Sequence, residues 1–245
     1  YGDLSELNKN GLILNTVGDE PLRNVVSEYM DLLETSAAVY EQNGDYALGL
    51  FTSGWCQMMD KASRKLCQTT NNKEALNSGK WLCHESCWKT SLEAMKNGKS
   101  ADMECDGGIN LYAFPVKSNG KIVGAINFGY SDPPKNEEKL NELSEKFNLP
   151  VDELRKKANA YQTRPGFIIE LAKKRLRKSA TYLGYIIERR LAEKAMRRSE
   201  ENLRVTLDSI GDAVIATDTE GYITRMNPVA ELLTGCKLTD VEGQP

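Results

Sequence analysis

The sequence predicts an α+β protein, with an antiparallel sheet, flanking helices and one long connector helix. Two pairs of strand-like segments are each joined by a short polar turn, which is how antiparallel strands connect. Helical segments lie around these pairs and do not alternate with single strands, as they would in a parallel sheet. An unbroken helical pattern then extends from Phe167 to about Ile210. At 245 residues, the chain is long enough for two small domains and a connection.

Residues 1–20 form a lead-in, in which the apolar run Leu12 to Leu14 predicts a short strand or an apolar anchor. Asp19-Glu20-Pro21 then places acidic residues and a proline where a helix start tolerates them. Leu22 and Val26 follow at helical spacing, so a helix with one buried face is expected.

A first hairpin is predicted from residues 36–40 and 46–51, because the Asn-Gly-Asp turn between them permits positive φ angles. A polar segment at 131–165 predicts a pair of helices that packs against the edge of the domain. The remaining expected elements are helices at 57–67 and 73–97 and a second hairpin from 109–116 and 121–130.

The long helix carries two apolar tracks. Every seventh residue is apolar in the set Ile169, Leu176 and Leu183, and Ala172, Ser179 and Ile186 form a second track. Seven-residue repeats are typical of a coiled coil. We therefore expect residues 167–207 to form a signalling helix through which two copies make a parallel homodimer.

Composition narrows the class of partner. A net charge of −3 and a pI near 5.5 provide no general case for nucleic-acid binding. The basic run at 173–178 lies on the long helix, where interspersed glutamates favour a solvated face. No apolar run approaches the roughly 20 residues needed to span a bilayer, and no signal peptide is evident, so a cytoplasmic location is expected. Because residue 1 is Tyr, the chain is expected to be an excised piece.

Cysteines are the strongest chemical signal. Five of the six lie between residues 56 and 105, inside one predicted domain. Thiolates bind soft and borderline metals, and the C-x3-C pair puts two sulfurs on adjacent helical turns. The alternative is that the cysteines are small buried hydrophobes. The candidate ligands of a zinc or iron–sulfur centre are Cys56, Cys83, Cys87 and Cys105, with Cys67 as the alternate member.

Aromatic residues flank these cysteines and suggest an apolar pocket for a small molecule, although ordinary core packing explains them equally well. His84 is the only histidine, so two-histidine zinc hydrolysis and Ser-His-Asp chemistry are disfavoured. A zinc enzyme built on Cys83, His84 and Cys87 stays as a minor alternative. The candidate ligand-binding residues are Trp55, Cys56, Cys67, Trp81, His84, Trp88, Tyr112 and Phe114.

The end of the chain resembles the first half of a PAS domain. Two strand-like segments at 214–217 and 222–226 flank Glu220-Gly221, and Asn227-Pro228 opens a helix that ends near Thr234-Gly235. Asn227 is a natural N-cap. The resemblance implies that residues 208–245 are a partial PAS domain.

The region from about 20 to 190 resembles a PocR-type sensory domain, a PAS-like ligand-binding module of prokaryotic regulators. The resemblance rests on Trp55-Cys56, Cys67, Cys105-Asp106-Gly107-Gly108, Tyr112 to Val116 and Val123 to Gly129. The sequence departs from the family pattern after Cys105, where a His-containing turn is absent, and it adds the segment Cys83 to Trp88.

Together the two resemblances imply a sensory input module without catalytic activity of its own. We expect a lead-in (1–20), a PocR-type ligand-sensing domain with a PAS-like sheet (21–166), a signalling helix (167–207) and the partial PAS domain (208–245). A sensor histidine kinase is the expected parent protein. The alternative is a DNA-binding transcription regulator that uses the same kind of input domain. The ligand itself is not predicted.

Overall fold

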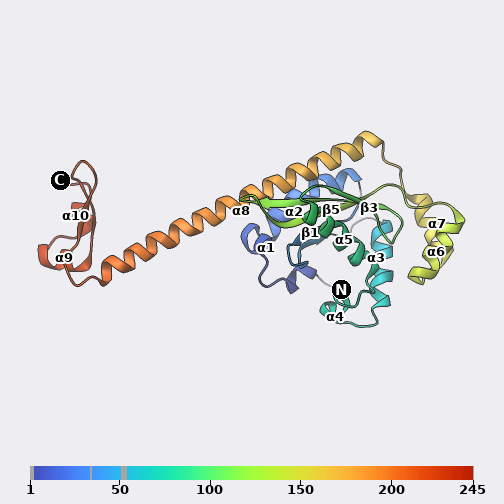
Figure 1. The fold of residues 1–245 in the computed structure, drawn as a ribbon, viewed down its shortest axis with the longest axis horizontal. Coiled ribbons are helices and arrows are strands. Elements are labelled where there is room, and N and C mark those ends of the chain that lie inside the picture. Colours follow the sequence, from blue (N-terminus) through green and yellow to red (C-terminus); the bar gives the residue numbers. More distant parts are fainter. Residues whose placement is uncertain (1–2, 34, 51–53, 245) are drawn as a thin grey trace. The chain divides into compact units, whose positions relative to one another are not determined.

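The structure is a computed structural model that describes residues 3–33, 35–50 and 54–244. The chain divides into two compact units, Tyr1–Arg189 and Arg190–Pro245, and each is described by itself. The first unit opens with the short 3-10 helix η1 (Leu4–Leu7) and contains an antiparallel five-stranded sheet with helices on both faces (Figure 1). The predicted α+β fold class is therefore confirmed.

The sheet has the strand order β2-β1-β5-β4-β3. The two predicted hairpins form within it, while β3 was not predicted because it has only four residues and a mostly exposed pattern. Residue 51, expected at the end of the first hairpin, lies outside the described residues. The strands are β1 (Ala37–Glu41), β2 (Tyr46–Leu50), β3 (Ala101–Glu104), β4 (Asn110–Ser118) and β5 (Lys121–Tyr130).

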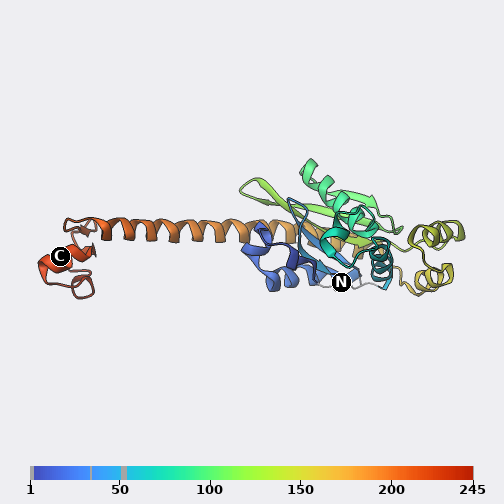
Figure 2. The same ribbon diagram turned by 90° about the horizontal axis from the view of Figure 1, so that it is seen from below.

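One face of the sheet is covered by α1 (Leu12–Val17), α2 (Asp19–Leu33) and the first part of α8 (Gly166–Ser209), which form one apolar cluster with it (Figure 2). The expected short strand at Leu12 to Leu14 is instead the start of α1. The buried Glu41 carboxylate explains this difference, since it accepts hydrogen bonds from Ile13 N and Leu14 N, at 2.9 Å each, at the helix start.

The opposite face of the sheet is covered by α3 (Gly54–Leu66), α4 (Asn72–Leu76) and α5 (Leu82–Asn97). The predicted helix pair, α6 (Glu137–Phe147) and α7 (Val151–Ala160), packs its apolar side against α3. The central sheet is thus enclosed between two helical layers, and the second layer is extended by a helix pair.

The first part of α8 is a core element of its own unit. Leu176 and Leu183 are fully buried in the cluster on the sheet, together with Ala172. Gly184 lies so close to β4 that an added Cβ atom would be 1.9 Å from the Lys117 carbonyl oxygen. The expected coiled-coil tracks are therefore corrected, because their main apolar residues pack against the chain's own sheet.

The second unit holds the remainder of α8 and a small hairpin with two short helices. Asn227 accepts a hydrogen bond from Ala230 N, as expected of an N-cap, and its side-chain amide donates to the carbonyls of Leu207 and Asp212. The predicted order of helix, hairpin and helix is present. The elements are β6 (Ile215–Thr217), β7 (Ile223–Met226), α9 (Pro228–Thr234) and α10 (Leu238–Val241).

Candidate ligand-binding cavity

A cavity of about 40 Å³ lies in the first unit between α3, α5 and the sheet face that these helices cover. Alternation along the strands turns Ala38, Asn127 and Gly129 toward this face. Four-residue spacing puts Cys83 and Cys87 on one side of α5. The lining residues are Ser36, Ala37, Ala38, Trp55, Cys56, Met59, Asp60, Cys83, Cys87, Cys105, Ile109, Leu111, Asn127 and Gly129.

Four thiols line this cavity, those of Cys56, Cys83, Cys87 and Cys105. Burial raises the pKa of Cys83 and Cys87 well above the usual range, and it raises the pKa of Cys105 to about 12. Neighbouring thiols contribute in the same direction, since each would repel a second negative charge. These three sulfurs are therefore neutral thiols at physiological pH, in surroundings that do not favour thiolates.

A buried carboxyl group faces the same cavity. Asp60 is 1% exposed, and its Oδ1 accepts a hydrogen bond of 2.8 Å from Trp81 Nε1. Its Oδ2 has no hydrogen-bond partner within residues 3–33, 35–50 and 54–244. Desolvation raises the pKa of this carboxyl to about 6, although the bond from Trp81 lowers it. Asp60 is thus mostly ionised at neutral pH, and one of its oxygens is left for another donor.

A second polar atom at the cavity is also unpaired. The hydroxyl of Ser36 is buried and has no hydrogen-bond partner in the described part of the chain. Its backbone is held in place, because Gly129 N donates to the Ser36 carbonyl at 3.1 Å. Buried polar side-chain atoms in native proteins nearly always have a partner. Two unpaired acceptor atoms therefore lie at the same cavity.

The turn after β3 closes the cavity on one side. Trp55 Nε1 donates to the Gly107 carbonyl at 3.0 Å, and this bond holds the turn against α3. Gly108 has a φ of 78°, and an added Cβ atom there would be 2.9 Å from Pro134. The turn therefore requires glycine at this position, and it places the Cys105 thiol at the cavity.

The lone histidine lies in a different environment. His84 Nδ1 is 2.9 Å from the Tyr46 hydroxyl, which accepts a hydrogen bond of 2.8 Å from the Tyr40 hydroxyl. Burial lowers the pKa of His84 to about 4, so the ring is neutral at physiological pH. His84 and Trp88 line a separate, polar hollow, and neither reaches the thiol-lined cavity. Cys67 also lies elsewhere, with its thiol directed at the Ser63 carbonyl under α4.

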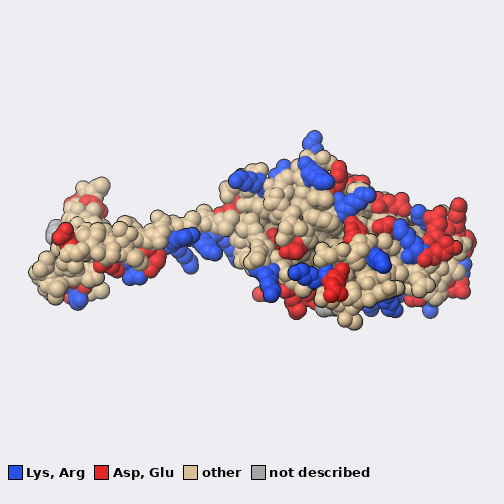
Figure 3. Space-filling model, turned by 60° about the horizontal axis from the view of Figure 1, so that its bottom comes forward, with Lys and Arg blue, Asp and Glu red and all other residues tan. Residues whose placement is uncertain are grey.

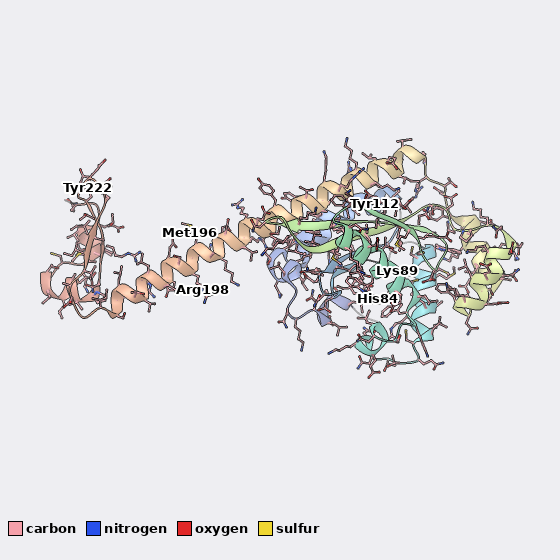
Figure 4. The ribbon with its side chains drawn as sticks, in the orientation of Figure 1. His84, Lys89, Tyr112, Met196, Arg198 and Tyr222 are labelled. Carbon is pink, nitrogen blue, oxygen red and sulfur yellow. The ribbon has the colours of Figure 1, made fainter. Side chains whose placement is uncertain are left out.

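Tyr112 and Phe114 lie on the other face of the sheet. They belong to the cluster under α8, and Figure 4 labels Tyr112. Lys173 Nζ is 5.1 Å from the centre of the Tyr112 ring. Alternation along β4 explains this, since Leu111 faces the cavity and its neighbour must face away. The structure thus brings Trp55, Cys56 and three further cysteines to one cavity. The other predicted ligand-binding residues lie outside it, with Trp81 acting only through its bond to Asp60.

A metal centre needs three or four ligand atoms that converge on one point. In the part of the chain that the structure describes, no group of three or more His, Cys, Asp or Glu side chains is arranged to hold a metal ion. The predicted metal set is nevertheless gathered around the cavity. A metal–thiolate centre would thus require these cysteines to move together and lose their protons.

Sequence reasoning did not identify Asp60 or Ser36 as site residues. A signal for Asp60 is present, because it follows Cys56 by four residues and lies among the apolar residues Met58, Met59 and Ala62. A carboxylate on a buried helical face requires a partner. No comparable signal exists for Ser36, whose exposure depends on how the strand packs.

Comparisons with known proteins agree with the fold. A family model described as the sensory domain found in PocR matches residues 17–196. The probable diguanylate cyclase DgcE of Escherichia coli strain K12 is 45% identical over 51 residues, so the matched segment is 21% of this chain and only 5% of that protein. The crystal structure of the E. coli DhaR(N)-DhaL complex gives a TM-score of 0.53 at 14% identity, covering 98% of this chain and 68% of that chain. At this identity, the likeness shows the fold alone.

Proposed function

Because the chain belongs to the family of sensory domains found in PocR, we propose that it is the input module of a cytoplasmic signal-transduction protein and binds a small molecule in the cavity between α3, α5 and the sheet. The observation that carries the proposal is the pair of unpaired polar atoms, Asp60 Oδ2 and Ser36 Oγ, in an otherwise mostly apolar cavity. Small-molecule sites combine apolar walls with a few polar groups that orient the ligand. The fragment is not expected to catalyse a reaction.

The sheet offers a route from the cavity to α8. Asn127 and Gly129 of β5 line the cavity, while Ile126 and Phe128 of the same strand pack in the cluster under α8. A ligand that shifts β5 would thus change the packing of α8 on the opposite face. This coupling needs no long chain of contacts, since one strand separates the two sites.

The second part of α8 is the proposed dimer contact. Met196 and Leu203 lie seven residues apart on α8 with side chains 65% and 53% exposed, and Ile210, seven residues further, follows the end of the helix. Tyr182, fourteen residues before Met196, is also exposed, while the position between them is Arg189. An exposed track of this period suits the seam of a parallel coiled coil with a second copy. This track replaces the one that Leu176 and Leu183 were expected to supply.

The ligand proposal is tested by thermal denaturation with a panel of small organic molecules, both neutral and charged. The Cys87→Leu variant fills the cavity, and Cys67→Val changes a buried thiol outside it as a matched control. We expect at least one compound to raise the melting temperature of the wild type and of Cys67→Val, but not of Cys87→Leu. If no compound does so, or if the filled variant responds equally, the cavity is not the sensory site.

A metal–thiolate centre is the second candidate, because four thiols line the cavity. Zinc or an iron–sulfur cluster would be held by Cys56, Cys83, Cys87 and Cys105, and bound metal would lower the pKa of each thiol it contacts. Elemental analysis and a visible spectrum of anaerobically purified protein test this candidate. Stoichiometric metal that is lost on Cys83→Ser would favour it over the organic ligand, whereas metal-free protein would remove it.

A sensor histidine kinase is the proposed parent protein, with a DNA-binding transcription regulator as the alternative. The likeness to part of a probable diguanylate cyclase supports a signalling role but favours neither output. On the face that Figure 3 shows, acidic and basic side chains are interspersed over the first unit, so we propose no nucleic-acid surface on it. None of the helices that the structure describes is long and apolar enough to cross a membrane. The coding sequence on either side of these residues would identify the output domain.

A further inference from the structure

The cavity carries a negative charge, and one oxygen of the carboxylate that bears it has no hydrogen-bond donor in the described part of the chain. Asp60 is the one residue among the described lining residues that carries a charge at neutral pH, since no Lys, Arg or His lines the cavity. The positive charge of Arg64 lowers the pKa of Asp60, but Asp60 Oδ2 has no hydrogen-bond partner among the residues that the structure describes. A buried carboxylate oxygen without a donor is costly, and natural proteins pair such groups with a cation or strong donors.

Arg64 follows Asp60 by four residues on α3, but its guanidinium bonds to other groups. Its guanidinium donates to the Thr69 carbonyl at 2.6 Å and to Asn72 Oδ1 at 3.0 Å, and it lies 5.1 Å from the centre of the Trp81 ring. Arg64 is therefore fixed by other contacts and makes no bond to Asp60 Oδ2. The unpaired oxygen is open to a ligand in the cavity.

The cavity is small, and its size restricts the ligand. A volume of 40 Å³ compares with about 10–15 Å³ for one water-sized position on the same measure. The cavity thus accommodates about three or four non-hydrogen atoms. Its walls, apart from Asp60, Ser36 and Asn127, are sulfur, aliphatic and aromatic groups, which suit methyl groups rather than further polar atoms.

We propose that this cavity binds a small alkylammonium ion, whose N–H groups donate to Asp60 Oδ2 and Ser36 Oγ while its methyl groups contact the cysteine and methionine sulfurs. The inference rests on the proposed sensory function and names the chemical class of its ligand. Asp60 supplies the charge and Ser36 supplies a second acceptor. Dimethylammonium, with two N–H groups and three non-hydrogen atoms, matches both acceptors and the volume.

A neutral alcohol of the same size is the competing ligand. It also has a donor for Asp60, but it adds no positive charge beside the buried carboxylate. Both ligands would donate to an ionised acceptor, which strengthens the bond in each case, but only the ammonium ion also brings a positive charge to the carboxylate. The ammonium ion is therefore favoured over the alcohol, because its positive charge offsets the cost of burying the Asp60 carboxylate.

The test is titration calorimetry and thermal denaturation of the full 245-residue chain with dimethylammonium and methylammonium chloride. Sodium chloride at equal concentration controls for ionic strength, and ethanol and methanol are the neutral counterparts of equal atom number. Asp60→Asn keeps the shape and an acceptor for Trp81 but removes the charge. Asp152→Asn removes an exposed charge from α7 as the matched control.

We expect an alkylammonium ion to bind the wild type and Asp152→Asn alike, and its affinity to fall at least tenfold in Asp60→Asn, as a charge-assisted bond of about 1.5–3 kcal/mol implies. Ser36→Ala should weaken binding by a smaller factor, and it tests the site if Asp60→Asn folds poorly. Binding that Asp60→Asn leaves unchanged, or binding of the alcohols alone, would overturn the ammonium inference. If neither the ammonium ions nor the alcohols bind, the ammonium inference is also overturned. In that case, a compound from the panel of organic molecules that stabilises the wild type but not Cys87→Leu would still support the proposed sensory function.

Discussion

The two faces of the sheet differ in how completely their side chains are paired. On the face under α8, aliphatic and aromatic residues such as Leu176, Leu183 and Phe128 are fully buried in one continuous cluster. On the face under α3 and α5, Asp60 and Ser36 each leave a polar atom unpaired beside a cavity. The first face is fully packed, whereas the second keeps two unpaired acceptors for the ligand that we propose. Under the proposed function, a ligand would act on the second face while the first stays folded and carries the response.

The largest expected effect on stability is at the sheet face under α8. Leu176→Glu would place a charge in a fully buried apolar site, and we expect it to lower the free energy of unfolding by at least about 4 kcal/mol. Lys174→Glu, an exposed substitution on the same helix, should change it by less than about 0.5 kcal/mol. Urea denaturation measures both. Similar, small losses in the two variants would mean that α8 is not part of the core.

On the sheet face under α3 and α5, removing the charge of Asp60 should instead raise the stability. The pKa of Asp60 rises from 3.8 to about 6 on folding, so its ionised form destabilises the protein by about 3 kcal/mol, at about 1.36 kcal/mol per pKa unit. The penalty is complete above pH 6 and absent below the unfolded value. We therefore expect Asp60→Asn to be more stable than the wild type at pH 7.5 and to lose this advantage as the pH falls to 4.

Urea denaturation at several pH values checks this prediction. His84, whose pKa is lowered to about 4, makes both proteins less stable as the pH falls below its unfolded value, so its effect cancels in the difference. A difference between Asp60→Asn and wild type that does not change with pH would mean that the carboxylate is solvated or paired.

The close approach of α8 to the sheet predicts a loss of stability in a glycine variant, smaller than the loss in Leu176→Glu. Alanine is usually preferred to glycine inside a helix by up to about 1 kcal/mol. At Gly184 the added methyl group would overlap the Lys117 carbonyl, so Gly184→Ala should instead destabilise the unit by about 1–3 kcal/mol. Gly166→Ala, which meets nothing within 4 Å at the start of α8, is the control. Thermal denaturation in which Gly184→Ala is the more stable variant would contradict this packing.

The smallest effect on stability is expected on the second part of α8. Leu203→Glu should leave the unfolding of the first unit within about 0.5 kcal/mol of wild type, because the side chain is 53% exposed. It should nevertheless convert a dimer to a monomer in light scattering, whereas Lys194→Glu, off the seven-residue track, should not. A wild-type protein that is monomeric at high concentration would exclude the proposed seam.

Local patterns in the sequence predicted much of the fold. Both hairpins, the long helix and the helix pair at α6 and α7 follow from periods of two and of about 3.6 residues, and from turn residues such as Gly44 and Gly120. The cysteines of the predicted metal set could also be assigned to one domain. By contrast, α1 could not be distinguished from a strand, because its start depends on Glu41, a residue distant in sequence.

Tertiary structure alone decided which side chains meet. The sequence identified an apolar stripe at Leu176 and Leu183 but could not tell whether a second copy or the chain's own sheet would cover it, since both remove the same surface from water. The same limit applies at the cavity, where Cys83 and Cys87 belong and Cys67 does not, although all three are buried or half-buried. Unpaired atoms such as Asp60 Oδ2 become visible only when every other donor has been placed, because hydrogen-bond satisfaction is a property of the whole packed structure.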